Sequence, residues 1–372
     1  MPKTSKLGGH AHGHRVRILV YSGDPGGAEA VAPVVPRFPK AWQTKVLAKT
    51  LALTTFRRYG SKPMDCSTWS WESMEKKCNE WSPMAILLSA SSLPEKDPTE
   101  MRLRRWAKSK SIPAVAIMDT WQNYSLRFRN PASGKITDLP ERIAVMDSGA
   151  VKDMVADGLP KAILAVTGHP GLESAGSMLR KNRSLSTGLS VLRLCHFSQP
   201  IRDFWGDSLG YDEFDVAKDL ISLIPALEAG LQRKVRLDIK LHPKESRRHF
   251  LSMVGNLPRG VRILSEKSDS FVALSQCDIA LGMGSIMLVK AALGSIPAIC
   301  YAPGREGSVE NSCIIAKRGL IPTIRNKEKL GAVIQGLTSD TLRAKHVKKQ
   351  DKFGRHRGAA KNVVRLVKDC LR

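Results

Sequence analysis

Long hydrophobic runs are missing from this sequence. No apolar stretch reaches the roughly 18 residues that a membrane-spanning helix needs. The first residues are polar and glycine-rich and lack the apolar core of a signal peptide. We therefore expect a cytoplasmic protein, either fully soluble or bound peripherally to the inner face of a membrane. Residues 1–14 are predicted to form a disordered tail, although His10, His12 and His14 alternate there and could hold an adventitious metal ion.

Cysteine is present only as seven scattered residues, an odd number without regular spacing. This pattern argues against a disulfide framework or a zinc site and indicates reduced, buried thiols. The sequence also lacks an RNP-type aromatic motif, a zinc-finger spacing and a helix-turn-helix pattern. A specific nucleic-acid partner is therefore not expected.

Positive charge is what the sequence has in excess. It contains 59 Lys and Arg against 34 Asp and Glu, a formal net charge of +25. Such an excess favours anionic partners, whether nucleic acid, acidic lipid or phosphorylated substrates. The excess is densest between Arg343 and Arg372. Within this segment, residues 358–371 have the apolar spacing of an amphipathic helix, which we expect to dock on the protein body, with docking on anionic lipid as the alternative.

The length of 372 residues exceeds one typical hydrophobic core, so two domains are expected. In both halves short apolar runs alternate with helix-like segments, which predicts an α/β fold with a parallel sheet in each. We place one Rossmann-like domain at 15–180 and a second at 186–340, with a polar stretch between them. Residues 341–372 are predicted to form a basic helical tail.

The sequence of residues 277–303 reads as strand, tight turn, helix and strand. The turn contains Gly282, Gly284 and Ser285. Glycines allow the backbone to approach a ligand closely, and the N-terminus of the following helix attracts an anion. The turn matches neither G-x-G-x-x-G nor a P-loop, so a strand-to-helix turn capped by Ser285 and without a ligand is the alternative.

A second glycine turn follows the first predicted strand, residues 16–21. It contains Asp24, Gly26, Gly27 and Glu29 and would lie at the carboxyl edge of a sheet, where α/β proteins bind ligands. Polar and aromatic residues also follow the strand-like segment 113–118. Asp119 and Trp121 are the two members of this group that a site would use, although Asp119 could simply cap a loop.

The order and spacing of these segments resemble the GT-B glycosyltransferases, in particular the superfamily of bacterial capsule and polysialic-acid sugar transferases, CDP-glycerol glycerophosphotransferases and UDP-N-acetylglucosamine 2-epimerases. The resemblance covers about residues 15–372. It implies two Rossmann-like doubly wound domains that face a central cleft. The segments that carry it are 18–29, 119–127, 167–170, 239–245 and 282–294.

The resemblance implies that the second domain binds an activated sugar nucleotide. His242 and Pro243 match a His-Pro pair whose histidine contacts the donor phosphate in related transferases. A histidine that ends a strand and bonds to backbone is the alternative. The remaining residues implied on the donor side are Gly282, Gly284 and Ser285 in the phosphate-binding turn, Lys240 and Lys244 beside His242, and Glu306 or Glu310 as the carboxylate that holds the ribose.

The resemblance also implies that the first domain presents the acceptor and supplies the base. We expect Asp24 to take the acceptor proton, with Asp119 as the second candidate and Glu29 as the third. Gly26, Gly27 and Trp121 would lie on the acceptor side. GT-B transferases generally need no metal ion, and no D-x-D motif is present, so no metal or cofactor is expected. Residues 211–214 contain acids without the glycine of the sialyltransferase motif, which disfavours a CMP-sialic-acid donor.

We therefore predict a glycosyltransferase that moves a sugar or polyol phosphate from a nucleotide-activated donor to a glycan or lipid-linked acceptor in surface polysaccharide synthesis. The predicted partners are the nucleotide-sugar donor, the acceptor and an anionic membrane surface. Two alternatives remain. One is a UDP-sugar 2-epimerase, which shares the architecture but usually needs more carboxylates around the sugar. The other is a non-catalytic protein that binds nucleotides or polyanions.

Overall fold

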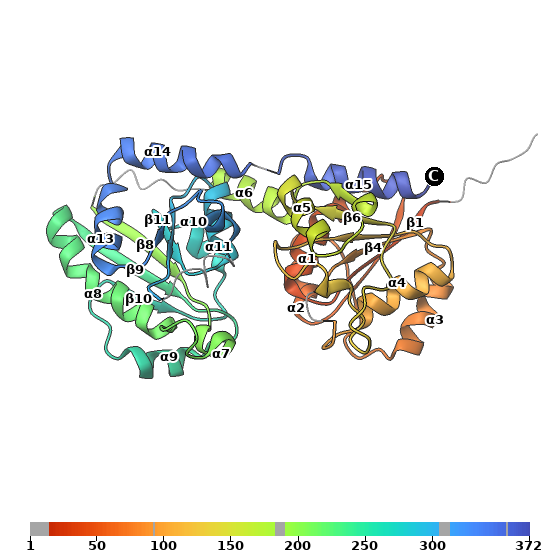
Figure 1. The fold of residues 1–372 in the computed structure, drawn as a ribbon, viewed down its shortest axis with the longest axis horizontal. Coiled ribbons are helices and arrows are strands. Elements are labelled where there is room, and N and C mark those ends of the chain that lie inside the picture. The colour runs from red at the N-terminus through yellow and green to blue at the C-terminus, as the bar shows by residue number, and fades with distance from the viewer. Residues whose placement is uncertain (1–14, 92–93, 183–189, 305–312, 355) are drawn as a thin grey trace, which may run out of the picture. The chain divides into compact units, whose positions relative to one another are not determined.

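A computed structural model describes residues 15–91, 94–182, 190–304, 313–354 and 356–372. The chain forms two compact units, each built on one parallel sheet (Figure 1). The predicted disordered tail, residues 1–14, lies outside the described residues, as does most of the polar stretch between the predicted domains. None of the helices in the described part combines the length and hydrophobicity needed to cross a bilayer.

The first unit contains a sheet of order β3-β2-β1-β4-β5-β6-β7. All neighbouring strands pair in parallel, for example with Ile18 of β1 opposite Ala85 of β4. Its strands are β1 (Arg17–Ser22), β2 (Gln43–Ala48), β3 (Met64–Asp65), β4 (Ala85–Ser89), β5 (Ala114–Ile117), β6 (Arg142–Val145) and β7 (Leu164–Val166).

Helices cover both faces of the first sheet. Its helices are α1 (Pro25–Val31), α2 (Leu51–Arg58), α3 (Trp71–Trp81), α4 (Thr99–Ser109), α5 (Ser148–Ala156) and α15 (Ala359–Cys370). Helix α6 (Pro170–Asn182) begins at the end of this unit and lies mostly in the second unit, which starts at Leu172. One core cluster joins β1, β2 and β4 to α1, α2 and α15, and another joins the opposite faces of these strands to α3 and α4. Because both faces are covered, β4 is buried at every residue, which explains its unbroken apolar sequence AILLS.

The second unit repeats this design with a sheet of order β10-β9-β8-β11-β12-β13. Its strands are β8 (Val191–Phe197), β9 (Lys234–Lys240), β10 (Val261–Leu264), β11 (Ile279–Gly282), β12 (Ala298–Tyr301) and β13 (Thr323–Ile324). Its helices are α7 (Ile201–Trp205), α8 (Glu213–Leu231), α9 (Arg247–Val254), α10 (Ser270–Ser275), α11 (Ile286–Leu293), α12 (Ile314–Lys317), α13 (Lys327–Gly336) and α14 (Asp340–Gln350). The predicted α/β class with two parallel sheets is therefore confirmed.

The division of the chain differs from the predicted boundaries in two places. The first unit ends at Gly171 rather than at residue 180, and it also includes the last segment, Gly358–Arg372. The predicted basic tail is therefore divided, with α14 in the second unit and α15 in the first. The reason is the apolar stripe of α15: Val363 and Val367 are completely buried in the core of the first unit. This docking leaves the apolar side of α15 unavailable to lipid.

The cysteines are free thiols, as the sequence predicted. All but one of the seven are buried, and Cys370 on α15 is half-buried. Burial raises the pKa of the Cys66 thiol to about 11 and that of Cys78 to about 12. A raised thiol pKa keeps the sulfur protonated and unreactive near neutral pH. These cysteines therefore serve packing.

Candidate functional site

Each sheet has one point where the strand order reverses, and α/β proteins bind ligands beyond the carboxyl ends of the strands at such points. In the first unit the reversal lies between β1 and β4, and in the second between β8 and β11. The predicted glycine turns follow β1 and β11 directly. The topology therefore places each predicted turn at the reversal point of its own sheet.

The turn after β1 is fixed around Asp24, which caps the N-terminus of α1. Its Oδ1 accepts a hydrogen bond of 2.8 Å from the Gly27 backbone N–H, and Ser22 Oγ donates to its backbone carbonyl at 3.1 Å. Pro25 fits the first helical position because its missing N–H has no partner there anyway. A Cβ at Gly27 would lie 2.5 Å from Ser89 Cβ, so only glycine lets α1 pack this closely against the end of β4.

The second carboxylate oxygen of Asp24 is unpaired in the described part of the chain. Oδ2 is buried and has no hydrogen-bond partner among the described residues, while the side chain as a whole is half-buried. Burial raises the pKa of Asp24 above its usual value, and the nearby Asp119 raises it further, against the hydrogen bond from Gly27 and the charge of Arg127. A carboxylate with a raised pKa and an oxygen without a hydrogen-bond partner has properties expected of a general base.

The structure brings the second predicted base, Asp119, close to Asp24. A Cβ at Gly26 would lie 3.1 Å from Asp119 Oδ2 and 3.2 Å from Asp24 Oδ1, so the two carboxylates flank the same glycine. Asp119 Oδ1 forms an ion pair of 2.7 Å with Arg127 Nη1. The Arg127 side chain is fully buried and also donates to the backbone carbonyls of Ala90 and Gln122. The two carboxylates therefore differ in environment, because only Asp119 pairs with the guanidinium.

Two aromatic rings lie beside Asp119. His169 Nε2 is 2.9 Å from the Asp119 backbone carbonyl, and because a carbonyl only accepts, Nε2 carries the proton. Trp121 stacks on His169 with ring centroids 6.4 Å apart, and its Nε1 donates to Asp147 Oδ2 at 2.7 Å. Trp121 is 8% exposed, so its predicted acceptor-side position offers little surface to a ligand. The segment of His169 contributed to the resemblance, yet the residue itself was not predicted as part of a site.

Glu100 of α4 is a site residue that the sequence did not indicate. Ser89 Oγ lies within hydrogen-bond reach of Glu100 and is 2.9 Å from Ser22 Oγ, and Ser91 N–H donates to Glu100 Oε2 at 2.6 Å. Burial raises the pKa of Glu100 to about 7. When Glu100 is protonated, each hydroxyl can donate to the next, from Glu100 through Ser89 and Ser22 to the Asp24 carbonyl. When it is ionised, this chain lacks one proton.

Glu29, the third predicted base, has a different partner. Its Oε1 pairs with Arg58 Nη1 of α2 at 2.8 Å, and the Arg58 side chain is 48% exposed. An exposed ion pair of this kind contributes little free energy and is easily screened. Nothing in its contacts links Glu29 to the pair formed by Asp24 and Asp119.

In the second unit the predicted phosphate turn is closed by an unpredicted residue. Gln199, which follows β8, accepts a hydrogen bond of 2.6 Å at Oε1 from the Gly284 backbone N–H. Ser285 caps α11 by accepting a hydrogen bond of 3.2 Å from Met287 N–H, as the sequence predicted for a serine in this turn. Gly282, the last residue of β11, is buried. An anion at this turn would have to replace Gln199 at the Gly284 N–H.

His242 follows β9 and presents one ring nitrogen outward. Its Nδ1 accepts a hydrogen bond of 3.2 Å from Lys244 N–H, so Nε2 carries the proton, and no described residue accepts from it. Burial lowers the pKa of His242, and the charges of Lys244 and Lys240 lower it further. At neutral pH the side chain is therefore a neutral hydrogen-bond donor. This geometry suits contact with a phosphate oxygen.

The two flanking lysines differ sharply. Lys240 is 2% exposed and its Nζ donates to the backbone carbonyls of Leu241 at 2.6 Å and Glu266 at 3.1 Å. Burial lowers its pKa. The predicted phosphate contact does not fit this placement, because the ammonium is committed to the protein interior. Lys244 is exposed, with Nζ 4.8 Å from the ring centroid of Phe204. Glu306 and Glu310 lie outside the described residues.

Acidic residues near this edge have structural partners. Glu245 is 9% exposed and accepts from Ser198 Oγ at 2.7 Å and from His242 N–H at 2.5 Å. Burial raises its pKa to about 7. Asp212, from the acidic segment at 211–214, forms a capping box with Asp215 at the start of α8. In the described ranges, no group of three His, Cys, Asp or Glu side chains could hold a metal ion.

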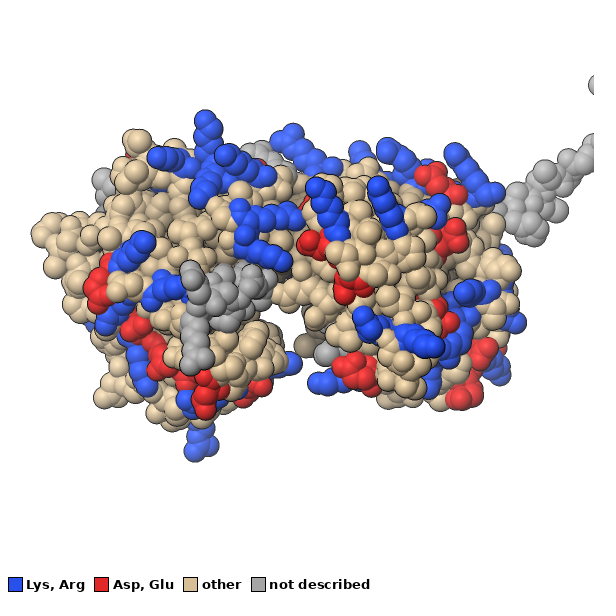
Figure 2. Space-filling model, in the orientation of Figure 1, with Lys and Arg blue, Asp and Glu red and all other residues tan. Residues whose placement is uncertain are grey.

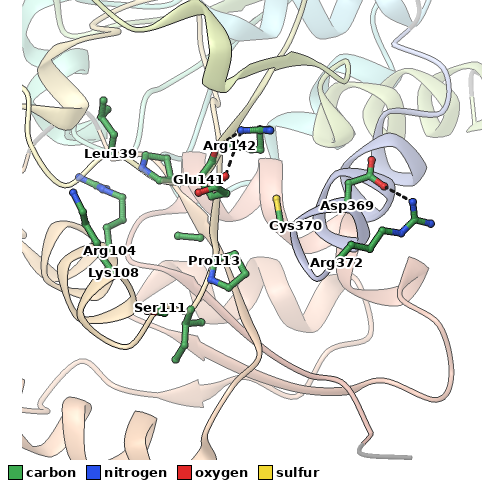
Figure 3. A pocket seen from close by; sticks show the side chains of 13 residues that line it. Arg104, Lys108, Ser111, Pro113, Leu139, Glu141, Arg142, Asp369, Cys370 and Arg372 are labelled. Atoms are coloured by element: carbon green, nitrogen blue, oxygen red, sulfur yellow. Dashed lines mark hydrogen bonds and ion pairs between the residues drawn. The ribbon is translucent and has the colours of Figure 1, made fainter.

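A large hollow of the first unit lies at the opposite edge of its sheet. It measures about 690 Å³ and is drawn in Figure 3. Pro113 and Ala114 line it at the start of β5 and Arg142 at the start of β6, while Cys370 and Arg372 line it from α15 and the chain end. Because Asp24 and Asp119 lie beyond the carboxyl ends of their strands, this hollow belongs to the other edge and is separate from the candidate site.

No protein-family model and no curated protein matches the sequence. Solved structures do resemble the chain. The UDP-GlcNAc 2-epimerase from Neisseria meningitidis, bound to UDP-GlcNAc, has a TM-score of 0.66 at 13% identity, over 95% of this chain and 100% of that one. MurG from Acinetobacter baumannii has a TM-score of 0.53 at 13% identity, over 95% and 99%. The glycotransferase of kitacinnamycin has a TM-score of 0.59 at 14% identity, over 96% and 99%.

These likenesses extend over almost the whole chain, and they include both epimerases and glycosyltransferases. They show that the chain has the GT-B fold, which the sequence resemblance had predicted. Identities this low establish the fold alone, because one fold hosts many activities. The function has to be argued from the residues at the two sheet edges.

Proposed function

We propose that this protein is a GT-B-type glycosyltransferase that uses a nucleotide-activated donor. The observation that carries the proposal is the state of Asp24. Its Oδ2 has no partner among the described residues, burial raises its pKa, and the neighbouring Asp119 is paired with the buried Arg127. Two neighbouring carboxylates in such different environments are typical of an acid–base site. A protein that only binds nucleotides has no need of this arrangement.

In the proposed reaction Asp24 accepts the proton of an acceptor hydroxyl. The hydroxyl oxygen forms a bond to the anomeric carbon of the donor sugar, the bond from that carbon to the phosphate oxygen breaks, and the nucleotide leaves with the bonding electrons. For a polyol-phosphate donor, the hydroxyl oxygen would instead form a bond to the phosphorus that carries the polyol. The bond from that phosphorus to the bridging oxygen would break, and the nucleoside monophosphate would leave with the bonding electrons. The role of Asp119 is to hold its negative charge beside Asp24, where it raises the affinity of Asp24 for the proton.

We place the donor phosphates at the carboxyl edge of the second sheet. His242 Nε2–H supplies a neutral hydrogen bond and the exposed Lys244 a positive charge. The Gly284 N–H becomes available when Gln199 is displaced, and it adds to the partial positive charge at the start of α11. The donor is a substrate, so the proposal includes no cofactor or metal ion.

The net charge of +25 supports an anionic acceptor, such as an acidic glycan or a lipid-linked phosphate, in surface polysaccharide synthesis. The same charge supports association with an anionic membrane surface. These parts of the proposal depend on charge alone and are tested separately from the chemistry of Asp24.

A UDP-sugar 2-epimerase is the second candidate. Several of the similar structures are UDP-N-acetylglucosamine 2-epimerases, which supports this activity as well as the transferase. An epimerase of this fold usually needs several carboxylates around the sugar. At the edge of the second sheet the carboxylate of Glu245 is committed to Ser198 and to the His242 backbone. Glu245 therefore cannot serve as one of these carboxylates.

The first experiment is a thermal-shift screen of the full chain against UDP, CDP, CMP, GDP and dTDP and their sugar conjugates. A ligand at a hundred times its Kd should stabilise the protein by about 2.7 kcal/mol. The responding nucleotide sugar is then followed by proton NMR without and with glycan acceptors. Inversion at sugar C2 without an acceptor would establish the epimerase, and acceptor-dependent nucleotide release the transferase. Binding without either reaction would refute both.

A further inference from the structure

A hollow with an apolar floor and a cationic rim lies between α13 and α14 of the second unit. Its volume is about 690 Å³. The floor consists of the aliphatic residues and glycine Ala332, Val333, Gly336, Leu337 and Leu342. The rim consists of five lysines, Lys329, Lys345, Lys348, Lys349 and Lys352. This lysine-rimmed hollow is separate from the sheet edge assigned to the donor, so its role does not depend on the proposed function.

The two helices hold the lysine-rimmed hollow open because α14 is anchored elsewhere. Gln350, 1% exposed, accepts from Ala298 N–H at 2.7 Å and donates to the Ile296 carbonyl at 3.1 Å. His346 Nε2 lies 3.0 Å from the Ala298 carbonyl. These bonds attach α14 to the turn and strand at β12, and Leu342 is left 50% exposed. Leu342 therefore offers an accessible apolar contact on the floor of the hollow.

The rim lysines have no carboxylate partner among the described residues. Within the described ranges, none of the five rim lysines forms an ion pair with a carboxylate. Figure 2 shows Lys and Arg side chains gathered over the part of the second unit that carries α14. The hollow of the first unit is different: there Arg142 pairs with Glu141 at 3.5 Å and Arg372 with Asp369 at 3.9 Å (Figure 3). The two hollows therefore differ. In the lysine-rimmed hollow, the cations surround an apolar surface and have no carboxylate partners in the described part of the chain.

We propose that the lysine-rimmed hollow docks an acidic amphipathic helix of a partner protein. The apolar side chains of that helix would cover Leu342 and Val333, and its flanking carboxylates would face the lysines. Opposite charges at the rim of an interface mainly guide association and set the orientation. The described residues that line the lysine-rimmed hollow include five lysines and no carboxylate. The negative charges of the interface would therefore all come from the partner helix.

Other occupants fit less well. A bilayer is flat, and the lysine rim would hold it away from a concave floor. The described lining has no Phe, Tyr or Trp on which bases could stack and no Arg for bidentate phosphate contacts, which disfavours a nucleic acid. The N-terminal segment of the chain contains lysines and histidines but no acid in its first 14 residues. A second copy of a chain with a net charge of +25 would be repelled.

The test uses the full chain and a fluorescein-labelled synthetic helix with leucines spaced three and four apart and glutamates on both sides. A scrambled peptide of the same composition is the first control. We expect the double variant Lys345→Glu/Lys349→Glu, and separately Leu342→Gln, to weaken binding of the helix at least roughly tenfold by fluorescence anisotropy. The variant Lys108→Glu/Lys110→Glu changes the net charge equally in the first unit and should leave the Kd within about twofold.

Leu342→Gln removes the apolar contact without changing the charge, and unchanged thermal melts verify that each variant is folded. Equal binding of the scrambled peptide would overturn the proposal, because the apolar pattern would then be irrelevant. Equal loss in the control variant would also overturn it, since net charge would explain the result. Vesicles with about one-third phosphatidylglycerol provide a further arm. If the hollow variants abolish vesicle binding while the peptide does not bind, the occupant is membrane rather than a helix.

Discussion

The two units share a strand topology but present opposite chemistry at their reversal points. Each point is bridged by one side-chain hydrogen bond, from Ser89 to Ser22 in the first unit and from Gly284 to Gln199 in the second. Beyond that bridge the first unit offers a carboxylate with a raised pKa, Asp24. The second offers hydrogen-bond donors, His242 and Gly284. The fold sets where a ligand can bind, whereas the residues that follow the strands decide what it can be.

The largest expected effect comes from Asp24→Asn. Asparagine is as good a helix cap as aspartate, so the turn should remain intact. The variant cannot take a proton, and we expect turnover to fall roughly 10²- to 10⁴-fold. Donor affinity should not change, because the donor is assigned to the second unit. Initial rates and isothermal titration with the nucleotide identified in the screen measure the two quantities.

The matched control is Glu29→Gln, which removes a carboxylate from the same helix. Its ion pair with Arg58 is surface exposed, so activity should stay within about twofold of wild type. If Asp24→Asn retained full turnover, Asp24 would not be the base. The first unit would then not supply the proton acceptor that distinguishes it from the second unit.

The next effect concerns α15, which joins the first core from the end of the chain. Val363→Ala removes two methyl groups from a completely buried site and should destabilise the first unit by about 2 kcal/mol. Urea denaturation, followed by tryptophan fluorescence and by hydrogen exchange of each unit, should show the loss in the first unit. Lys361→Ala on the exposed side of α15 is the control. A loss confined to the second unit would contradict the assignment of α15.

A smaller effect is expected in the pH dependence of stability. Burial raises two carboxyl pKa values from 4.5 to about 7, that of Glu100 in the first unit and that of Glu245 in the second. A raised carboxyl pKa means that the folded protein binds more protons, so the free energy of unfolding falls as pH rises from about 4.5 to 7.

The variants Glu100→Gln and Glu245→Gln resemble the protonated side chains and should each flatten this fall. Urea titrations at pH 5 and pH 8 provide the comparison, and each variant should gain stability relative to wild type at the higher pH. A wild-type slope retained in both variants would show that these carboxyls do not titrate in this range, and that the hydroxyl chain to Asp24 does not depend on Glu100.

The smallest effect is expected at the donor edge. His242→Ala removes a neutral hydrogen bond to phosphate and should weaken nucleotide binding about tenfold. His249→Ala is the control, because His249 is exposed on α9 and contacts Phe214 edge-on, with ring centroids 5.5 Å apart. Equal Kd values for the wild type and His242→Ala in calorimetric titrations would remove His242 from the donor site.

Much of the fold could be predicted from local patterns. Alternating apolar runs and helical segments indicated two parallel sheets, and glycine turns after β1 and β11 indicated the ligand edges. Local patterns did not reveal Glu100 or Gln199, since a glutamate on a helix and a glutamine after a strand carry no motif. They also suggested that Lys240 contacts phosphate, whereas burial turned it toward backbone carbonyls.

The sequence by itself determined the elements of this protein, because hydrophobic period, caps and turn residues act within a few positions along the chain. Tertiary structure alone decided which residues meet. It placed Asp119 and the buried Arg127 beside Asp24, returned α15 to the first core, and left the lysines of α13 and α14 that rim the hollow without carboxylates among the described residues. Contacts between distant segments depend on strand order and packing, and burial then sets the charge and pKa of each group.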